Sequence, residues 1–201
     1  MLPPAAEYGI TDCYIKPYAC CRHIQPAVEA AFGLCTDEDI KFDDIKKVDV
    51  ETYKIATEHA HVPWDDFASA QLSFPYLMGL ATRYRGVKFE HFDDKNRADP
   101  AFTDFASKLT VSAPTEIDQL YPKLRPARVT ITTSKGKFVR QADEAWGSRQ
   151  VPLDDEGLIA KFHGLVGPVF GEPRAKRLSE LLWNVEALDN VAPLAEALAK
   201  V

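Results

Sequence analysis

The chain has 201 residues, of which 46% are hydrophobic and 27% charged, and its formal net charge at pH 7 is -6. This composition is typical of a globular protein with one sizeable core or two smaller ones, and it excludes a disordered or fibrous class. The acidic balance disfavours nucleic acid as a partner, because phosphate binding needs an excess of Lys and Arg gathered on one face.

No apolar run approaches the roughly 20 residues that span a bilayer, and the N-terminus lacks the basic start and apolar block of a secretory signal. We therefore expect no membrane association and a cytoplasmic location. The four cysteines lack the paired C-x-x-C units of a zinc site and the ligand spacing of an iron-sulfur cluster. We expect reduced thiols, no metal and no cofactor.

The first predicted elements are a helix, a strand and a longer helical run. The helix begins near Pro26, a residue favoured in a first turn, and Gly33 lies near its end. β-Branched residues in partial alternation predict a strand over 45–53. Apolar residues recur at helical spacing over 65–85, but Pro75 must kink or divide that run, because proline lacks an amide donor and clashes with the preceding turn.

The middle of the chain predicts one further helix and three strands. A short helix is expected over 99–108, starting at an Asp-Pro pair, and a strand over 109–112. Residues 127–133 and 138–142 read as two strands joined by a tight turn. This segment is the clearest hairpin in the sequence.

The remainder, 154–201, is predicted to be helical in two or three pieces. Strands and helices without regular βαβ alternation indicate an α+β fold, with an antiparallel sheet, helices packed on it, and a C-terminal helical segment. We place residues 1–150 in the α+β domain and residues 151–201 in the C-terminal helices of the same fold.

The loop before the first predicted helix concentrates a lysine, an arginine and a histidine. Lys16 and Arg22 can pair carboxylates, and His23 can move a proton near neutral pH. The loop therefore suits a small-anion site with His23 as the candidate base. The alternative is a basic, aromatic loop that precedes a helix and has no chemical role.

Other motifs in the sequence give weaker indications of function. Glu58, His59 and His61 could ligate a metal, but they lie in a predicted loop without a fixed third ligand. The sequence contains no G-x-x-x-x-G-K-[ST], G-x-G-x-x-G or G-x-S-x-G motif. We therefore expect neither a glycine-rich nucleotide-binding loop nor the nucleophile elbow of the usual serine hydrolases.

The string KPYACCRHIQPAVEAA, residues 16–31, resembles the motif that opens the C-terminal part of MmgE/PrpD family enzymes. This family includes 2-methylcitrate dehydratases, cis-aconitate decarboxylases and an iminodisuccinate epimerase. Four later segments resemble family signatures in the same order: 44–50, 70–76, 99–111 and 147–162. The resemblance thus covers nearly the whole chain.

The resemblance implies an enzyme that acts on a small di- or tricarboxylate by proton abstraction. Dehydration, isomerisation or epimerisation, and decarboxylation stay open, with a 2-methylcitrate dehydratase-like lyase favoured. The resemblance places Lys16 and His23 at positions that line the active cleft in several branches of the family. These two residues are therefore the catalytic candidates. Gln25 matches a polar position of the dehydratase branch, and Tyr76 lies on a helix that approaches the cleft. With Arg22 they are the substrate-binding candidates.

The chain departs from the family in length, since members are usually more than twice as long and begin with a large all-helical domain. That domain supplies catalytic aspartate and histidine residues, and nothing in this sequence corresponds to it. The chain would then be a fragment, a split-gene subunit or a free-standing relic, and would be inactive alone. We expect it to pair with such a helical domain or subunit and to form a homo-oligomer, most simply a dimer. The alternative is a non-catalytic binding or assembly module that kept the fold.

Overall fold

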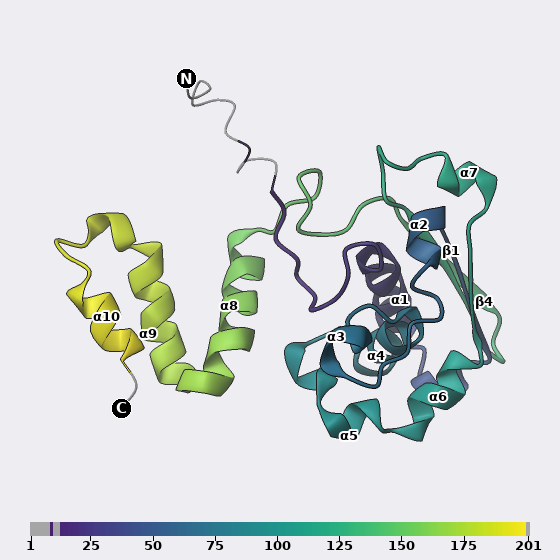
Figure 1. Cartoon of the computed structure of the whole chain (residues 1–201), viewed down its shortest axis with the longest axis horizontal. Helices are drawn as coiled ribbons and strands as arrows, with labels where there is room; N and C mark the ends of the chain where they lie inside the picture. The colour runs from purple at the N-terminus through teal and green to yellow at the C-terminus, as the bar shows by residue number, and fades with distance from the viewer. Residues whose placement is uncertain (1–8, 10–12, 200–201) are drawn as a thin grey trace. The chain divides into compact units, whose positions relative to one another are not determined.

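The computed structural model describes Gly9 and residues 13–199, and it divides the chain into two compact units, Met1–Pro152 and Leu153–Val201 (Figure 1). Each unit is described by itself. Within the described part of the chain, no helix combines the length and the apolar character that a membrane span requires.

The first unit contains a four-stranded sheet of order β2-β1-β3-β4. Its strands are β1 (Lys47–Thr52), β2 (Leu109–Ser112), β3 (Ala127–Thr132) and β4 (Lys137–Ala142). β3 runs antiparallel to both β1 and β4, whereas β1 and β2 are parallel. The α+β class is therefore confirmed, with a mostly antiparallel sheet. The parallel pair is joined by a long crossover, as parallel strands require.

One face of the sheet is buried. Val48 and Val50 of β1 lie opposite Ile131 and Val129 of β3, and all four side chains are buried, as the period of two along a strand dictates. Helix α1 (Gln25–Asp37) packs on β3 and β4 and against α4 (Figure 1). The sheet and α1 thereby fix the position of the loop that precedes α1.

The predicted helical run over 65–85 is divided. α3 (Phe67–Ala70) is capped by Asp66, and α4 (Phe74–Tyr84) carries Pro75 in its first turn. Proline is tolerated there because its missing N–H would have no intrahelical partner in any case. α4 ends at Tyr84, and the residue that caps it, Arg85, has a left-handed φ of 53°.

The crossover from β1 to β2 and the loop after β2 contain short helices, most of which are not predicted from the sequence. They are α2 (Lys54–Thr57), α5 (Asp94–Arg97), α6 (Pro100–Ala106) and α7 (Thr115–Asp118), with a 3-10 turn at Phe89–Phe92. A further 3-10 turn, Phe42–Asp44, lies between α1 and β1. Of these, α6 is the helix predicted to start at an Asp-Pro pair, and Asp99 caps it.

The second unit is helical. It consists of α8 (Asp155–Phe170), α9 (Glu172–Trp183), a 3-10 turn at Val185–Ala187 and α10 (Ala192–Leu198). α9 packs against both α8 and α10. Several large apolar side chains stay exposed, among them Val169 (68%) and Val191 (66%).

Candidate functional site

His23 lies two residues before α1, and its imidazole meets residues from two distant parts of the chain. Nδ1 of His23 is 2.6 Å from the hydroxyl oxygen of Tyr53, which directly follows β1. The ring of Tyr121 stacks on that of Tyr53, with centroids 4.6 Å apart and planes 8° from parallel. The fold therefore brings the motif loop, the end of β1 and the loop after α7 together at one imidazole.

The hydrogen bond between His23 and Tyr53 decides which ring nitrogen carries the proton. Burial raises the pKa of Tyr53, so its hydroxyl stays protonated at neutral pH. If the hydroxyl donates to Nδ1 of His23, Nε2 carries the proton and is a proton donor. If Nδ1–H donates to the Tyr53 oxygen, Nε2 keeps a lone pair and is a base. Tyr53 thus couples the orientation of the imidazole to its acid–base role.

The surroundings of His23 favour its neutral form. Burial lowers its pKa from the usual 6.5, and the nearby His59, Arg125 and Arg22 lower it further, while Glu58 opposes them. The ring of His59 is stacked on that of His23 with centroids 6.0 Å apart. A neutral imidazole at pH 7 is the form that can accept a proton.

His59 contacts a cysteine of the motif loop. Its Nε2 lies 3.5 Å from Sγ of Cys21, and the backbone N–H of Cys21 donates to the carbonyl of Gln71 at 2.9 Å. These contacts attach the segment between α2 and α4 to the motif loop. Within the ranges that the structure describes, no three His, Cys, Asp or Glu side chains are grouped to hold a metal ion.

The two cations of the motif have different surroundings. Arg22 donates from Nη2 to Glu144 Oε2 at 3.4 Å, with side chains 17% and 4% exposed, and its guanidinium lies 3.7 Å from the ring centroid of Tyr14. Lys16 is half-buried. Burial raises the pKa of the Cys20 thiol, and the positive charge of Lys16 partly opposes that rise. The charge of Lys16 is therefore felt at the buried side chain of Cys20.

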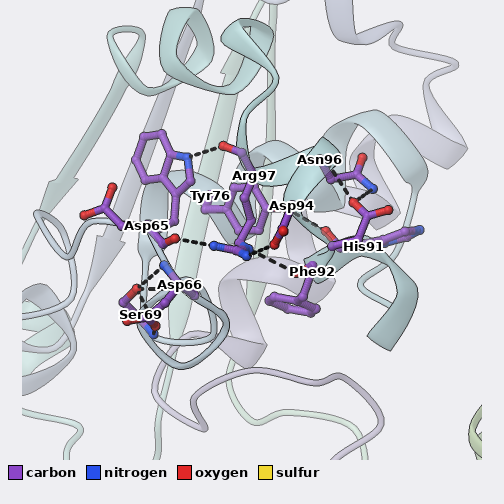
Figure 2. A network of polar contacts seen from close by, with 11 residues as sticks. Asp65, Asp66, Ser69, Tyr76, His91, Phe92, Asp94, Asn96 and Arg97 are labelled. Carbon is purple, nitrogen blue, oxygen red and sulfur yellow. Dashed lines mark hydrogen bonds and ion pairs between the residues drawn. The ribbon is translucent and has the colours of Figure 1, made fainter.

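The side chains of Gln25 and Tyr76 donate hydrogen bonds to backbone carbonyls. Gln25 is 1% exposed and donates from Nε2 to the carbonyl of Cys20 at 3.3 Å, so it holds the shape of the motif loop. Tyr76 is buried on α4, and its hydroxyl donates to the carbonyl of His91 at 2.6 Å. Figure 2 shows Tyr76 beside a network of polar contacts around Arg97. No contact described in the structure links Tyr76 to His23.

The structure adds residues that sequence reasoning missed. Tyr53 and Tyr121 shape the imidazole site, and Arg125 lies 5.6 Å from the ring centroid of Tyr121, which gives the site a second arginine. Tyr53 carried a usable signal, because it is the last residue of the strand predicted over 45–53. Tyr121 and Arg125 carried none, since they lie in a loop without a pattern.

Comparison with known proteins agrees with the resemblance in the motif. Residues 18–187 match the MmgE/PrpD C-terminal domain. The chain belongs to the MmgE/PrpD family. It is similar to a cis-aconitate decarboxylase of Aspergillus terreus and to one of Aspergillus terreus strain NIH 2624 / FGSC A1156; each is 28% identical over 196 residues, covering 92% of this chain and 40% of the relative. The chain thus spans about two fifths of the length of these curated relatives.

Proposed function

We propose that this chain is the C-terminal part of an MmgE/PrpD enzyme that transfers a proton at a carbon atom of a small di- or tricarboxylate. The hydrogen bond between His23 and Tyr53 carries the proposal. It holds a neutral imidazole at the start of a helix, with Arg22 and Arg125 close enough to lower its pKa. His23 is the proposed base, and Lys16 and Arg22 are the proposed carboxylate contacts.

The electrostatics of this region favour an anion. α1 has no acidic residue in its first turn and no side-chain cap, so no carboxylate of its own first turn opposes the positive end of the helix. The arginine at position 22 retains further N–H donors after pairing with Glu144, because a guanidinium carries five. A carboxylate near His23 would meet a helix N-terminus and fixed positive charge together.

The neutral imidazole suits proton abstraction. In a dehydration, Nε2 of His23 takes the proton from carbon, the C–H electrons form the double bond, and hydroxide leaves with a proton from another donor. This step requires the tautomer in which Nδ1–H donates to the Tyr53 oxygen. The dehydratase-like motif makes a hydro-lyase the favoured reaction, and the His23–Tyr53 contact is compatible with it.

Decarboxylation is the second candidate, because both curated relatives are cis-aconitate decarboxylases. There the C–C bond to the leaving carboxylate breaks, carbon dioxide departs, and the electron pair must be protonated at carbon. His23 would then donate rather than accept, in the tautomer in which the Tyr53 hydroxyl donates to Nδ1. The two reactions thus differ in the direction of one hydrogen bond.

The proposed enzyme needs more than this chain. The exposed apolar residues of α8–α10, such as Val169 and Val191, support an additional partner surface. We propose that a helical domain or subunit supplies the remaining catalytic groups, that the assembly is a dimer, and that this chain alone turns over little or no substrate.

Calorimetric titration with citrate, 2-methylcitrate, cis-aconitate and succinate tests the proposal. We expect saturable binding of at least one acid, weakened about tenfold, or about 1.4 kcal/mol, by Lys16→Ala or His23→Gln. Lys135→Ala, on the exposed turn between β3 and β4, is the matched control and should bind normally. Binding of no acid, or equal binding by all variants, would reject the proposal and favour the non-catalytic module.

A further inference from the structure

The four thiols of the chain have different surroundings. Cys20 and Cys35 are buried, and burial raises the pKa of both, that of Cys35 to about 11. Cys13 is exposed, and its thiol contacts the carbonyl of Gly9. Cys21 is half-buried and has an imidazole nitrogen, Nε2 of His59, at 3.5 Å. Cys21 alone among them has a described contact to a base.

The contact between Cys21 and His59 is held from both sides by backbone hydrogen bonds. The Cys21 N–H donates to the Gln71 carbonyl at 2.9 Å. The carbonyl of His59 accepts from Phe74 N–H at 3.1 Å, and its N–H donates to the Ala56 carbonyl at 3.2 Å. The sulfur and the nitrogen thus belong to two loops that backbone hydrogen bonds hold in place.

A thiol beside an imidazole is a nucleophile beside its base. The thiolate is the attacking form of cysteine, and a base within hydrogen-bond reach supplies it at neutral pH. We propose that Cys21 is a reactive thiol, activated by His59, and that it is the site at which soft carbon electrophiles modify this chain. With an alkyl iodide the S–C bond forms, the C–I bond breaks, iodide leaves, and the thiol proton passes to Nε2 of His59.

This inference goes beyond the proposed function, which uses no step at Cys21. The reactive thiol and the candidate site are nevertheless adjacent. The His59 ring that contacts Cys21 also stacks on the His23 ring, with centroids 6.0 Å apart. An adduct on Cys21 would add bulk beside the imidazole of His23. Modification of this thiol would therefore alter the candidate site.

Limited alkylation with iodoacetamide at pH 7, followed by peptide mass spectrometry, tests the inference on the whole chain. We expect Cys21 to react at least about tenfold faster than the exposed Cys13, because a nearby base outweighs partial burial. Cys20 and Cys35 should stay unmodified and thereby report that the fold is intact. A Cys21 rate equal to or below that of Cys13 would overturn the inference.

Variants of the two loop histidines test the role of His59. His59→Gln should lower the alkylation rate of Cys21 at least about fivefold and leave Cys13 unchanged, since the base is removed. His61→Gln, two residues away and exposed, is the matched control and should react like the wild type. An unchanged rate in His59→Gln would overturn the inference. If that variant exposes Cys20 and Cys35, the wild-type comparison of Cys21 with Cys13 decides.

Discussion

The hydroxyl of Tyr53 lies 2.6 Å from Nδ1 of His23. Tyr53 directly follows β1, whereas His23 lies in the loop before α1, so the contact joins the sheet to that loop. Tyr53 is buried and stacked on Tyr121, so its hydroxyl is held at one place. The imidazole is consequently oriented by the sheet and not only by its own loop. The following predictions test this arrangement and the fold that supports it.

Tyr53→Phe should change the protonation pattern of His23, because it removes the group that faces Nδ1. We expect a loss of about 1 kcal/mol in the free energy of unfolding and a new ring-nitrogen pattern for His23 in ¹⁵N NMR. Tyr76→Phe is the matched control, since it removes an equally buried hydroxyl that bonds to the His91 carbonyl at 2.6 Å. It should cost similar stability and leave the His23 signals in place. Equal effects of both variants on His23 would remove the positioning role of Tyr53.

The stability of the chain should fall in mild acid. Burial is the main reason that the pKa of His23 and that of His91 lie below the usual 6.5. Between the folded-state pKa and 6.5 the unfolded chain binds more protons than the folded one, so stability rises with pH across that window and is fully present above it. Conversely, stability is lost as the pH falls through the folded pKa.

Urea unfolding of the wild type and of His23→Gln between about pH 5 and 7 measures this dependence. The variant should lose part of the slope, with the His91 contribution remaining. NMR titration of His23 should give a midpoint below 6.5, the usual value. A midpoint at or above that value, or identical slopes for both proteins, contradicts the surroundings assigned to His23.

Arg22→Met should destabilise the fold by about 3 kcal/mol, because it leaves the carboxylate of Glu144 buried without its cation. The Glu144 side chain is 4% exposed, and its Oε1 has no hydrogen-bond partner among the described residues. The double variant Arg22→Met with Glu144→Leu should recover most of that loss, since it removes the buried charge. Chemical denaturation checks both. A single variant as stable as the wild type would assign Arg22 to substrate binding alone.

Two buried helical glycines should respond oppositely to alanine. At Gly79 of α4 an added Cβ would lie 2.7 Å from a ring carbon of Phe102, so Gly79→Ala should cost about 1–3 kcal/mol by overpacking. At Gly33 of α1 the nearest group is the flexible guanidinium of Arg140, which can move away. Gly33→Ala should be neutral or stabilising by up to about 1 kcal/mol. Equal losses in thermal unfolding would indicate a rigid Arg140.

Local signals made much of the fold predictable. Pro26 starts α1 and Pro75 divides the helical run over 65–85, because a proline dictates structure at its own position. The hairpin of β3 and β4 follows from a tight turn between two alternating segments. The parallel pairing of β1 with β2 was not predictable, because alternation within a strand carries no information about the direction of its neighbour.

The site was predictable only in part. His23 stood out by residue type and by its place before a helix with fixed cations beside it. Its partners Tyr53, His59 and Tyr121 lie in other segments, and only the register of the sheet and the course of the loops bring them to the imidazole. Gln25 and Tyr76 resembled functional positions in sequence, whereas the structure bonds both side chains to backbone carbonyls.

The most direct test of the central claim is an NMR titration of this chain with cis-aconitate, following the ring signals of His23, assigned with His23→Gln. The account predicts a saturable shift at His23, lost in Lys16→Ala, while the exposed His61 does not move. No shift at His23 in the folded chain, or equal shifts at His23 and His61, would contradict a carboxylate site built around the His23–Tyr53 pair.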